Sequence, residues 1–335
     1  MKTRFKDVLA KHFPLFPFLF SLTAVALLAP ATVAAQAYPV KPVRIIVGFT
    51  PGGGNDVISR LVAQKLSTAF GRSFVVENRP GASGMIGAEL AAKSPPDGYT
   101  LLLAGVATHA VNPNLMKNVP YDPVRDFDPI CLMATAPALL VVHPALPARS
   151  VKQFIALARA RPGAMNYASS GYGSSAQLAT ELFKSLTKTR LQHVPYKGVG
   201  AALNDLLSGQ VEVMFNAAAS LLPHTRSGRL RALGVGSVQR IEVIADVPTI
   251  AEAGVTGYQA GSWYGFVAPT GTPRAIINSL SKETAAAVRS PDIASKLAAE
   301  ANLVIGSSPE EFAAHIKGEL ARIGKVIREA GITME

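Results

Sequence analysis

Short apolar runs alternate along the chain with longer stretches whose apolar residues recur every three or four positions. The short runs are rich in valine, isoleucine and leucine, which is typical of strands buried in a parallel sheet. The longer stretches have the spacing of amphipathic helices. The predicted strands are residues 42–49, 73–77, 99–104, 138–143, 165–168, 191–194, 211–215 and 230–235. The predicted helices are residues 57–66, 85–92, 151–160 and 176–187, one that ends at residue 207, and then residues 275–289, 293–301 and 309–330.

This alternation predicts two α/β units, each with a mostly parallel sheet that helices cover on both faces. The part of the chain after residue 275 is mostly helical. The length agrees, since 335 residues at about 150 residues per domain suggest two domains. Hydrophobic residues make up 49% of the chain, which is enough for sizeable cores and excludes intrinsic disorder.

Two glycine-rich segments follow predicted strands, one in each unit. The first loop, Thr50–Asp56, contains three glycines, and the second loop, Ser169–Ser175, contains two glycines and four serines. Ligands of open α/β sheets bind at the carboxyl ends of strands, where helix N-termini offer free backbone N–H groups. Both loops therefore favour a bound anion without a cationic side chain. The alternative is that both are tight turns, with Asn55 and Ser174 as helix N-caps.

The first 37 residues have the pattern of a secretory signal. Four basic residues in Met1–His12 precede the apolar run Phe13–Ala29, and Ala35-Gln36-Ala37 offers the small residues that a signal peptidase reads. The alternative is a membrane anchor, but a run of about 17 apolar residues that prolines interrupt is short for one. We expect cleavage after Ala37 and a soluble, exported chain, because no later segment has about 20 uninterrupted apolar residues.

The net charge of the chain is +11, from 33 basic and 22 acidic residues. The predicted leader carries four basic residues and one acidic residue, so part of this surplus leaves with it. The remaining lysines and arginines occur singly, without blocks of like charge or interleaved aromatics, which argues against a nucleic-acid partner. The single cysteine, Cys131, excludes an intramolecular disulfide and is interpreted as a buried apolar residue.

Several kinds of chemistry have no motif in the sequence. For a dinucleotide site, three glycines follow the first predicted strand and Glu77 ends the next, but Val57 stands where the third glycine of the fingerprint belongs. The chain has no P-loop lysine motif, no H-E-x-x-H or H-x-H spacing for a metal, and no G-x-S-x-G around an activated serine. His193 is interpreted as a strand-end packing residue. We therefore expect no cofactor, no metal and no enzymatic activity.

A series of different short motifs follows one another along the chain. They are Ile45–Asp56, Val76–Ala82, Pro96–Leu101, Tyr121–Pro123 with Asp126–Phe127, Asn166–Gly171, His193–Gly198, Gly209–Val211, Val247–Thr249 with Glu252–Gly254, and Ser262–Gly265. Together they resemble the solute-binding receptors of tripartite tricarboxylate transporters, the Bug or TctC-like family. The resemblance covers roughly Tyr38 to Ile332.

The resemblance implies a periplasmic receptor of the type II binding-protein kind, with two α/β lobes and a two-strand hinge, that closes around its ligand. It places lobe 1 at residues 38–140 and 266–335, and lobe 2 at residues 141–265. It implies a small organic carboxylate as the ligand and the membrane subunits of a tripartite tricarboxylate transporter as the partner. We expect a monomer.

The resemblance also implies a ligand site built from loop backbones, hydroxyl groups and bridging water. Carried over by position, its residues are Phe49, Gly52, Gly53 and Thr108 in lobe 1, and Ser169, Ser170, Gly171, Ser174, Ser175 and Asn216 in lobe 2. Asp56 also matches the family, and stabilisation of the helix start explains it as well as ligand contact does.

Three positions depart from the family pattern. Asn216 lies where many relatives have an aspartate, and a neutral amide removes the natural partner of a ligand ammonium group. We therefore expect a ligand without an amine; the alternative is that Asn216 only caps the following segment. Gly48 and Thr50 stand where relatives usually have proline, and they alter the width or the stiffness of the first loop.

Two other function classes stay open at this point. A ligand-dependent sensor or orphan receptor that acts on a signalling partner needs the same closing cleft as a transport receptor. An exported enzyme needs an activated nucleophile, a metal or an acid–base pair in that cleft, and the sequence has no motif for one.

Overall fold

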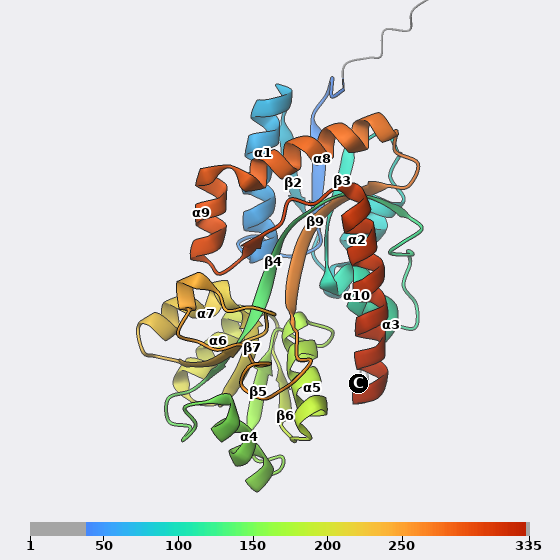
Figure 1. Ribbon diagram of the computed structural model, residues 1–335. Helices are drawn as coiled ribbons and strands as arrows, with labels where there is room; N and C mark the ends of the chain where they lie inside the picture. The colour runs from blue at the N-terminus through green and yellow to red at the C-terminus, as the bar shows by residue number, and fades with distance from the viewer. Residues whose placement is uncertain (1–37, 333–335) are drawn as a thin grey trace, which may run out of the picture. The chain divides into compact units, whose positions relative to one another are not determined.

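The strands of the fold belong to one mixed sheet. The computed structural model describes residues 38–332 (Figure 1), so the predicted leader and its cleavage site lie outside the described residues. The strands are β1 (Val43–Val47), β2 (Phe74–Asn78), β3 (Thr100–Gly105), β4 (Phe127–Val142), β5 (Asn166–Ser169), β6 (Gln192–Pro195), β7 (Val213–Ala217), β8 (Arg231–Val235), β9 (Gly261–Pro269) and β10 (Leu303–Val304). Their order is β2-β1-β3-β9-β4-β7-β5-β6, with β8 and β10 paired to β4. The predicted α/β class is confirmed.

Two groups of parallel strands lie in the outer parts of this sheet. β1 pairs in parallel with β2 and β3, and β5 pairs in parallel with β6 and β7. Antiparallel pairs all involve β4 or β9. Because the carboxyl ends of neighbouring parallel strands meet at one edge, the first loop after β1 shares an edge with the ends of β2 and β3. The second loop after β5 shares an edge with the end of β7.

β4 connects the two groups of strands. Its residues 127–137 pair with β9, and its residues 138–142 pair with β7 and β8. The sequence pattern placed the start of this strand at residue 138, eleven residues too late. Pro129 and Pro137 made the earlier part look unlike a central strand. The structure accommodates Pro129 with irregular pairing, since the register to β9 shifts directly after it, whereas Pro137 lies where the pairing with β9 ends.

Helices flank the sheet on both faces (Figure 1). They are α1 (Gly54–Phe70), α2 (Met85–Ala92), α3 (Asn112–Leu115), α4 (Val151–Ala160), α5 (Ser175–Thr187), α6 (Val199–Ser208), α7 (Ala218–Arg226), α8 (Arg274–Arg289), α9 (Pro291–Ala299) and α10 (Pro309–Ala330), with short 3-10 or π turns at Ala82–Gly84, Ala107–Val111 and Glu242–Ile244. The sequence pattern missed α3 and α7. Pro223 lies inside α7 and a proline opens α3, which obscured both.

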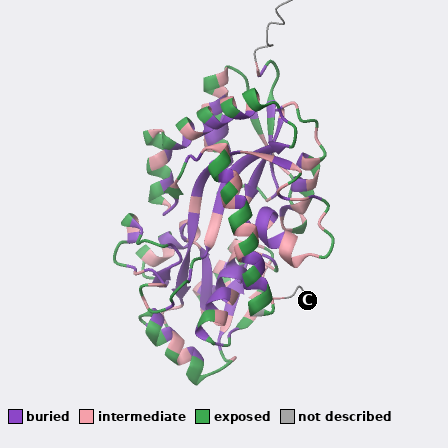
Figure 2. Cartoon of the chain, turned by 45° about the vertical axis from the view of Figure 1, so that its right-hand side comes forward, coloured by how far each residue is buried: buried purple, intermediate pink, exposed green. Residues whose placement is uncertain are grey.

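An aromatic cluster fills the space between β9 and α10. Trp263 lies edge-on to Phe312 and His315 of α10, at ring-centroid distances of 5.6 and 5.2 Å. The same indole lies 6.2 Å from His109, whose ring is 5.1 Å from Phe127. Figure 2 shows that β4 and β9 are buried along most of their length, while α10 alternates between buried and exposed residues. This packing holds α10 against β9, one of the two strands that lie between the two groups of parallel strands.

The predicted lobe boundaries fall inside the connecting strands, since residues 140 and 141 belong to β4 and residues 265 and 266 to β9. These boundaries stay a prediction.

Among residues 38–332, no helix combines the length and the apolar character that crossing a bilayer requires.

Candidate functional site

The first loop turns sharply into α1. Gly52 has φ = 86°, which favours glycine, and Gly53 is the N-cap of α1 with no side-chain cap. The alternative in which Asn55 caps this helix is therefore wrong, because Asn55 lies within the first turn. The backbone N–H groups of Gly54 and Asn55 donate to no protein group in the described chain. A Cβ atom on Gly54 would lie 2.8 Å from the hydroxyl of Tyr264, so β9 closes this corner tightly.

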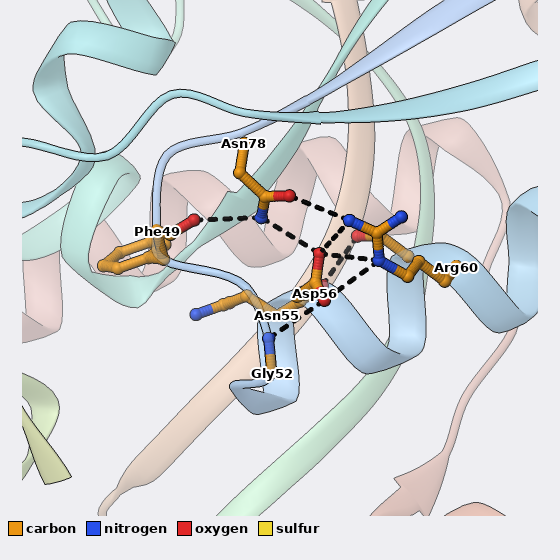
Figure 3. A network of polar contacts seen from close by, with 7 residues as sticks. Phe49, Gly52, Asn55, Asp56, Arg60 and Asn78 are labelled. Atoms are coloured by element: carbon orange, nitrogen blue, oxygen red, sulfur yellow. Dashed lines mark hydrogen bonds and ion pairs between the residues drawn. The ribbon is translucent and has the colours of Figure 1, made fainter. Parts of the chain in front are cut away.

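Asp56 holds the first loop in place (Figure 3). Its carboxylate is 4% exposed and accepts hydrogen bonds from Gly52 N at 3.0 Å, Asn78 Nδ2 at 2.9 Å and Arg60 Nε at 3.0 Å. Asn78 Nδ2 also donates to Phe49 O at 3.0 Å. Burial by itself raises the pKa of Asp56, but the hydrogen bonds from Arg60, Gly52 and Asn78 outweigh it, so this pKa lies below its usual value. Both carboxylate oxygens are used inside the protein, which makes Asp56 a scaffold residue.

A left-handed turn lies beside the first loop. Gly81, Ala82, Ser83 and Gly84 all have positive φ, at 136°, 46°, 53° and 89°. Such a backbone is costly for alanine and serine, and strain of this kind clusters at ligand-binding segments. This segment was not predicted as part of the ligand site, although its two glycines are the signal that could have found it.

Gly84 lies among residues predicted for the site. A Cβ atom on Gly84 would lie 2.8 Å from Thr108 Cγ2 and 3.1 Å from the ring of Phe49, so the side chains of Phe49 and Thr108 both lie against Gly84. A Cβ atom on Gly48 would lie 2.8 Å from the backbone of Gly84. Gly48 therefore allows the left-handed turn to pack directly against β1.

Thr108 is buried and its hydroxyl is already engaged. It is 1% exposed, and its Oγ1 lies 2.9 Å from Nδ1 of His109 and 3.3 Å from the backbone of Gly105. His109 is fully buried among aromatic rings, and this burial lowers its pKa to about 3. Its Nε2 atom has no hydrogen-bond partner in the described chain. In this state Thr108 shapes the wall beside the first loop through contacts with its own neighbours.

The second loop begins α5 as predicted. Ser174 is the N-cap, and its side chain accepts a hydrogen bond from Gln177 N at 3.3 Å. Gly171 has φ = 120°, so the loop needs a glycine there. The hydroxyls of Ser170 and Ser175 are half-buried and bond to no group in the part of the chain that the structure describes.

Ser169 stabilises the second loop through its buried hydroxyl group. It is fully buried, and its Oγ lies 3.1 Å from Gly171 N and 2.7 Å from Nε2 of His193. The His193 ring stacks on Tyr167 at 4.7 Å and meets Tyr172 edge-on at 5.2 Å. Burial lowers the pKa of His193. His193 is thus a packing residue of β6, as the sequence indicated.

The second loop faces the left-handed turn. Ser83 Oγ donates to Tyr172 O at 3.5 Å, and a Cβ atom on Gly173 would lie 3.7 Å from Ser83 Oγ and 3.8 Å from Asn112 Oδ1. Asn112 is fully buried and donates to Ser83 O at 3.0 Å, while its Oδ1 has no partner in the described residues. The structure therefore brings together two loops that are about ninety residues apart. The sequence analysis did not single out Asn112.

Asn216 lies near the carboxyl end of β7, at the edge of the sheet that carries the second loop. It is 7% exposed, and its Nδ2 donates to Ser220 Oγ of α7 at 2.8 Å. The alternative that Asn216 only caps the following segment is wrong, because the N-cap of α7 is Ala217 and no side chain of the described residues caps this helix. Within residues 38–332, no group of three or more histidine, cysteine, aspartate or glutamate side chains is placed to hold a metal ion.

The chain has clear relatives. The sequence profile described as "Tripartite tricarboxylate transporter family receptor" matches residues 58–332. Protein BugT of Bordetella pertussis is 38% identical over 306 residues, which covers 91% of this chain and 94% of BugT. The structure of R. palustris Rpa4515 with adipate is 40% identical with a TM-score of 0.82, over 88% of this chain and 99% of that one. MatC from Rhodopseudomonas palustris with bound malate is 31% identical with a TM-score of 0.79, over 87% of this chain and all of MatC. The chain belongs to the tripartite tricarboxylate transporter receptor family, a family of periplasmic solute-binding receptors and not of enzymes.

Proposed function

We propose that this receptor binds a small carboxylate between the first loop and the second loop and delivers it to the membrane subunits of a tripartite tricarboxylate transporter. The observation that carries the proposal is the start of α1, where the N–H groups of Gly54 and Asn55 donate to no protein group in the described chain. A helix N-terminus with free N–H groups favours an anion. Ser170, directly after β5, and Ser175, the first residue of α5, add hydroxyl donors from the second loop.

The proposed ligand has no amino group. Two similar structures are named for complexes with adipate and malate, which are carboxylates without an amine. Asn216 supports the same class, since its amide is neutral and its Nδ2 is bonded to Ser220. A carboxylate in place of Asn216 would attract a ligand ammonium group, and the amide offers no such charge.

A thermal-shift series tests the ligand class. Adipate, malate, glutamate and the uncharged adipamide are added to the purified receptor at equal concentrations. A carboxylate at about 100 times its Kd stabilises the folded state by about 2.7 kcal/mol. For a chain of this size that raises Tm by about 4 °C. We expect a rise with at least one dicarboxylate and none with adipamide. Tight binding of glutamate would overturn the proposal of an amine-free ligand.

Two serine variants test the site itself. Ser170→Ala and Ser175→Ala each remove one hydroxyl, and the loss of a hydrogen bond to a charged group costs about 1.5–3 kcal/mol, or about tenfold or more in Kd. Ser227→Ala, at the far end of α7, is the matched control and should leave Kd unchanged. Unchanged Kd in both loop variants would place the ligand elsewhere.

We also propose the organisation of the mature receptor. Residues 1–37 are removed after Ala37 on export to the periplasm, the receptor is a monomer, and lobe 1 (residues 38–140 and 266–335) closes on lobe 2 (residues 141–265) by bending of β4 and β9. Mass spectrometry of the periplasmic fraction tests the cleavage site, and light scattering tests the monomer. Vesicles that carry the membrane subunits should take up the carboxylate only when the receptor is present. Uptake without the receptor would contradict the transport role.

A further inference from the structure

The positive charge of the chain is distributed unevenly between its two halves. Residues 141–265 hold twelve basic and six acidic residues, whereas the remaining residues from 38 onward hold 17 and 15. The 52 residues from Pro129 to Thr180 contain no aspartate or glutamate. The basic residues are single in the sequence, yet the second half carries most of the excess.

Part of this excess gathers at one end of the second half. Arg159, in the last turn of α4, donates from Nη2 to Thr187 O at 2.8 Å, and Gly163 N donates to Arg190 O at 3.0 Å. These bonds hold the end of α4 against the connection between α5 and β6. We call five exposed side chains of α4, of the residue after it and of the connection from α5 to β6 the basic tip; they are Lys152 in the first turn of α4, Arg159, Arg161, Lys188 and Arg190. Figure 1 shows α4 at the bottom of the view.

The basic tip has no acidic partner in the described chain. None of its five side chains takes part in the ion pairs between described residues. Outside residues 141–265, basic residues such as Arg44, Arg60 and Lys65 do pair with carboxylates. The acidic side chain of α5 is already occupied, since Glu181 pairs with Lys184 at 2.7 Å. All five side chains are exposed, so they are available to an external anion.

We propose that the basic tip binds the anionic headgroups of a phospholipid surface. A specific small anion needs a concave site, and two cavities of the described chain, of about 390 and 230 Å³, are lined by other residues. Leu186, two residues before Lys188, is 43% exposed, and an apolar side chain among cations suits the headgroup region of a bilayer. Several exposed cations on one surface are attracted to anionic lipid together. This binding holds the receptor at the membrane where its partner works.

Vesicle co-sedimentation tests the proposal with the form of the chain recovered from the periplasm, so that the basic, apolar leader does not interfere. The vesicles are phosphatidylcholine alone, or phosphatidylcholine with about a third phosphatidylglycerol. We expect binding only to the phosphatidylglycerol vesicles at low ionic strength, and its loss at about 0.5 M salt, where the Debye length falls to a few ångströms. No binding to these vesicles at low salt, or binding that resists salt, would overturn the proposal.

Two variants of equal net charge separate location from total charge. The tip variant carries the changes Lys152→Gln, Arg161→Gln, Lys188→Gln and Arg190→Gln, and keeps Arg159 because it bonds to Thr187. The control variant changes four exposed lysines of the other half that form no ion pair with described residues; they are Lys117→Gln, Lys282→Gln, Lys296→Gln and Lys317→Gln. We expect the tip variant to bind the anionic vesicles at least about tenfold more weakly, and the control variant to stay within about twofold of the parent.

The outcomes are distinct from those of the carboxylate site. Equal losses in the two variants would show an effect of net charge alone and would refute the basic tip. A tip variant that keeps vesicle binding but no longer binds the solubilised membrane subunits would show that the basic tip recognises an acidic protein, and the lipid proposal would be wrong. The Tm shift with a carboxylate should be the same in the tip variant and the parent, which shows that the variant is folded.

Discussion

Acid should destabilise this protein through one buried imidazole, that of His109. The ring is fully buried beside Phe127 and Trp263, and burial lowers its pKa from the ordinary 6.5 to about 3. The folded state therefore holds the neutral ring, while the unfolded chain takes up a proton below about pH 6.5. The stabilisation is complete above the unfolded pKa and is lost as the pH falls towards 3.

The size of the effect follows from the shift. Each pH unit between the two pKa values costs about 1.4 kcal/mol, so about two units of acidification from pH 6.5 remove 2 to 3 kcal/mol. His109→Phe keeps an aromatic ring in the cluster and removes the titration. Urea unfolding at about pH 7 and about pH 4.5 should show a smaller loss of unfolding free energy in the variant than in the parent, by about that amount.

Two results would contradict this reasoning. If the parent and His109→Phe lost the same unfolding free energy between the two pH values, the ring of His109 would not be held neutral by burial. If His224→Phe, which removes a half-buried imidazole of α7, reduced the acid loss as much as His109→Phe, the effect would not be specific to the aromatic cluster.

Three further substitutions separate the loops from the rest of the fold. Gly48→Ala places a Cβ atom 2.8 Å from the backbone of Gly84 and should cost about 1–3 kcal/mol of unfolding free energy, measured in urea. Asp56→Asn removes the charge that holds Gly52 N and should cost about 1–3 kcal/mol, with weaker carboxylate binding by calorimetry. Ser308→Ala removes the capping box of α10 and should cost about 1 kcal/mol with no change in carboxylate affinity. A loss of affinity in Ser308→Ala equal to that in Asp56→Asn would refute the scaffold role of Asp56.

Most of the fold could be predicted from the sequence because local pattern and final environment agree. The helices at residues 85–92, 151–160 and 309–330 have the predicted bounds. In the last two, the buried apolar residues lie on one face of the helix, whereas Ile86 and Leu90 of the first are exposed. The start of β4 could not be predicted, because Pro129 argues against a central strand and is accommodated by a register shift in the pairing with β9. That pairing joins residues more than 120 positions apart, and no local pattern carries it.

For the candidate site, the sequence marked the two loops but not the contacts of their residues. Glycines and serines after strands marked both loops, and the structure places Phe49, Gly84 and Thr108 together. The contacts of the Thr108 and Ser169 hydroxyls were not visible in the sequence: Oγ1 of Thr108 lies against Nδ1 of the neighbouring His109, and Oγ of Ser169 lies against Nε2 of His193 on β6. The resemblance gave residue types at the site, whereas the hydrogen bonds decide which hydroxyls are free.

The aromatic cluster between β9 and α10 has an optical consequence. Trp263 is the single tryptophan of the sequence, and it lies on one of the two strands that connect the halves, 5.2 Å from the ring of His315. Indole emission from this protein therefore comes from one known position. A movement of α10 against β9 changes the distance between these two rings and with it the quenching of the indole. The receptor thus carries its own fluorescent label beside the connecting strands, and its motion can be followed in solution without adding a dye.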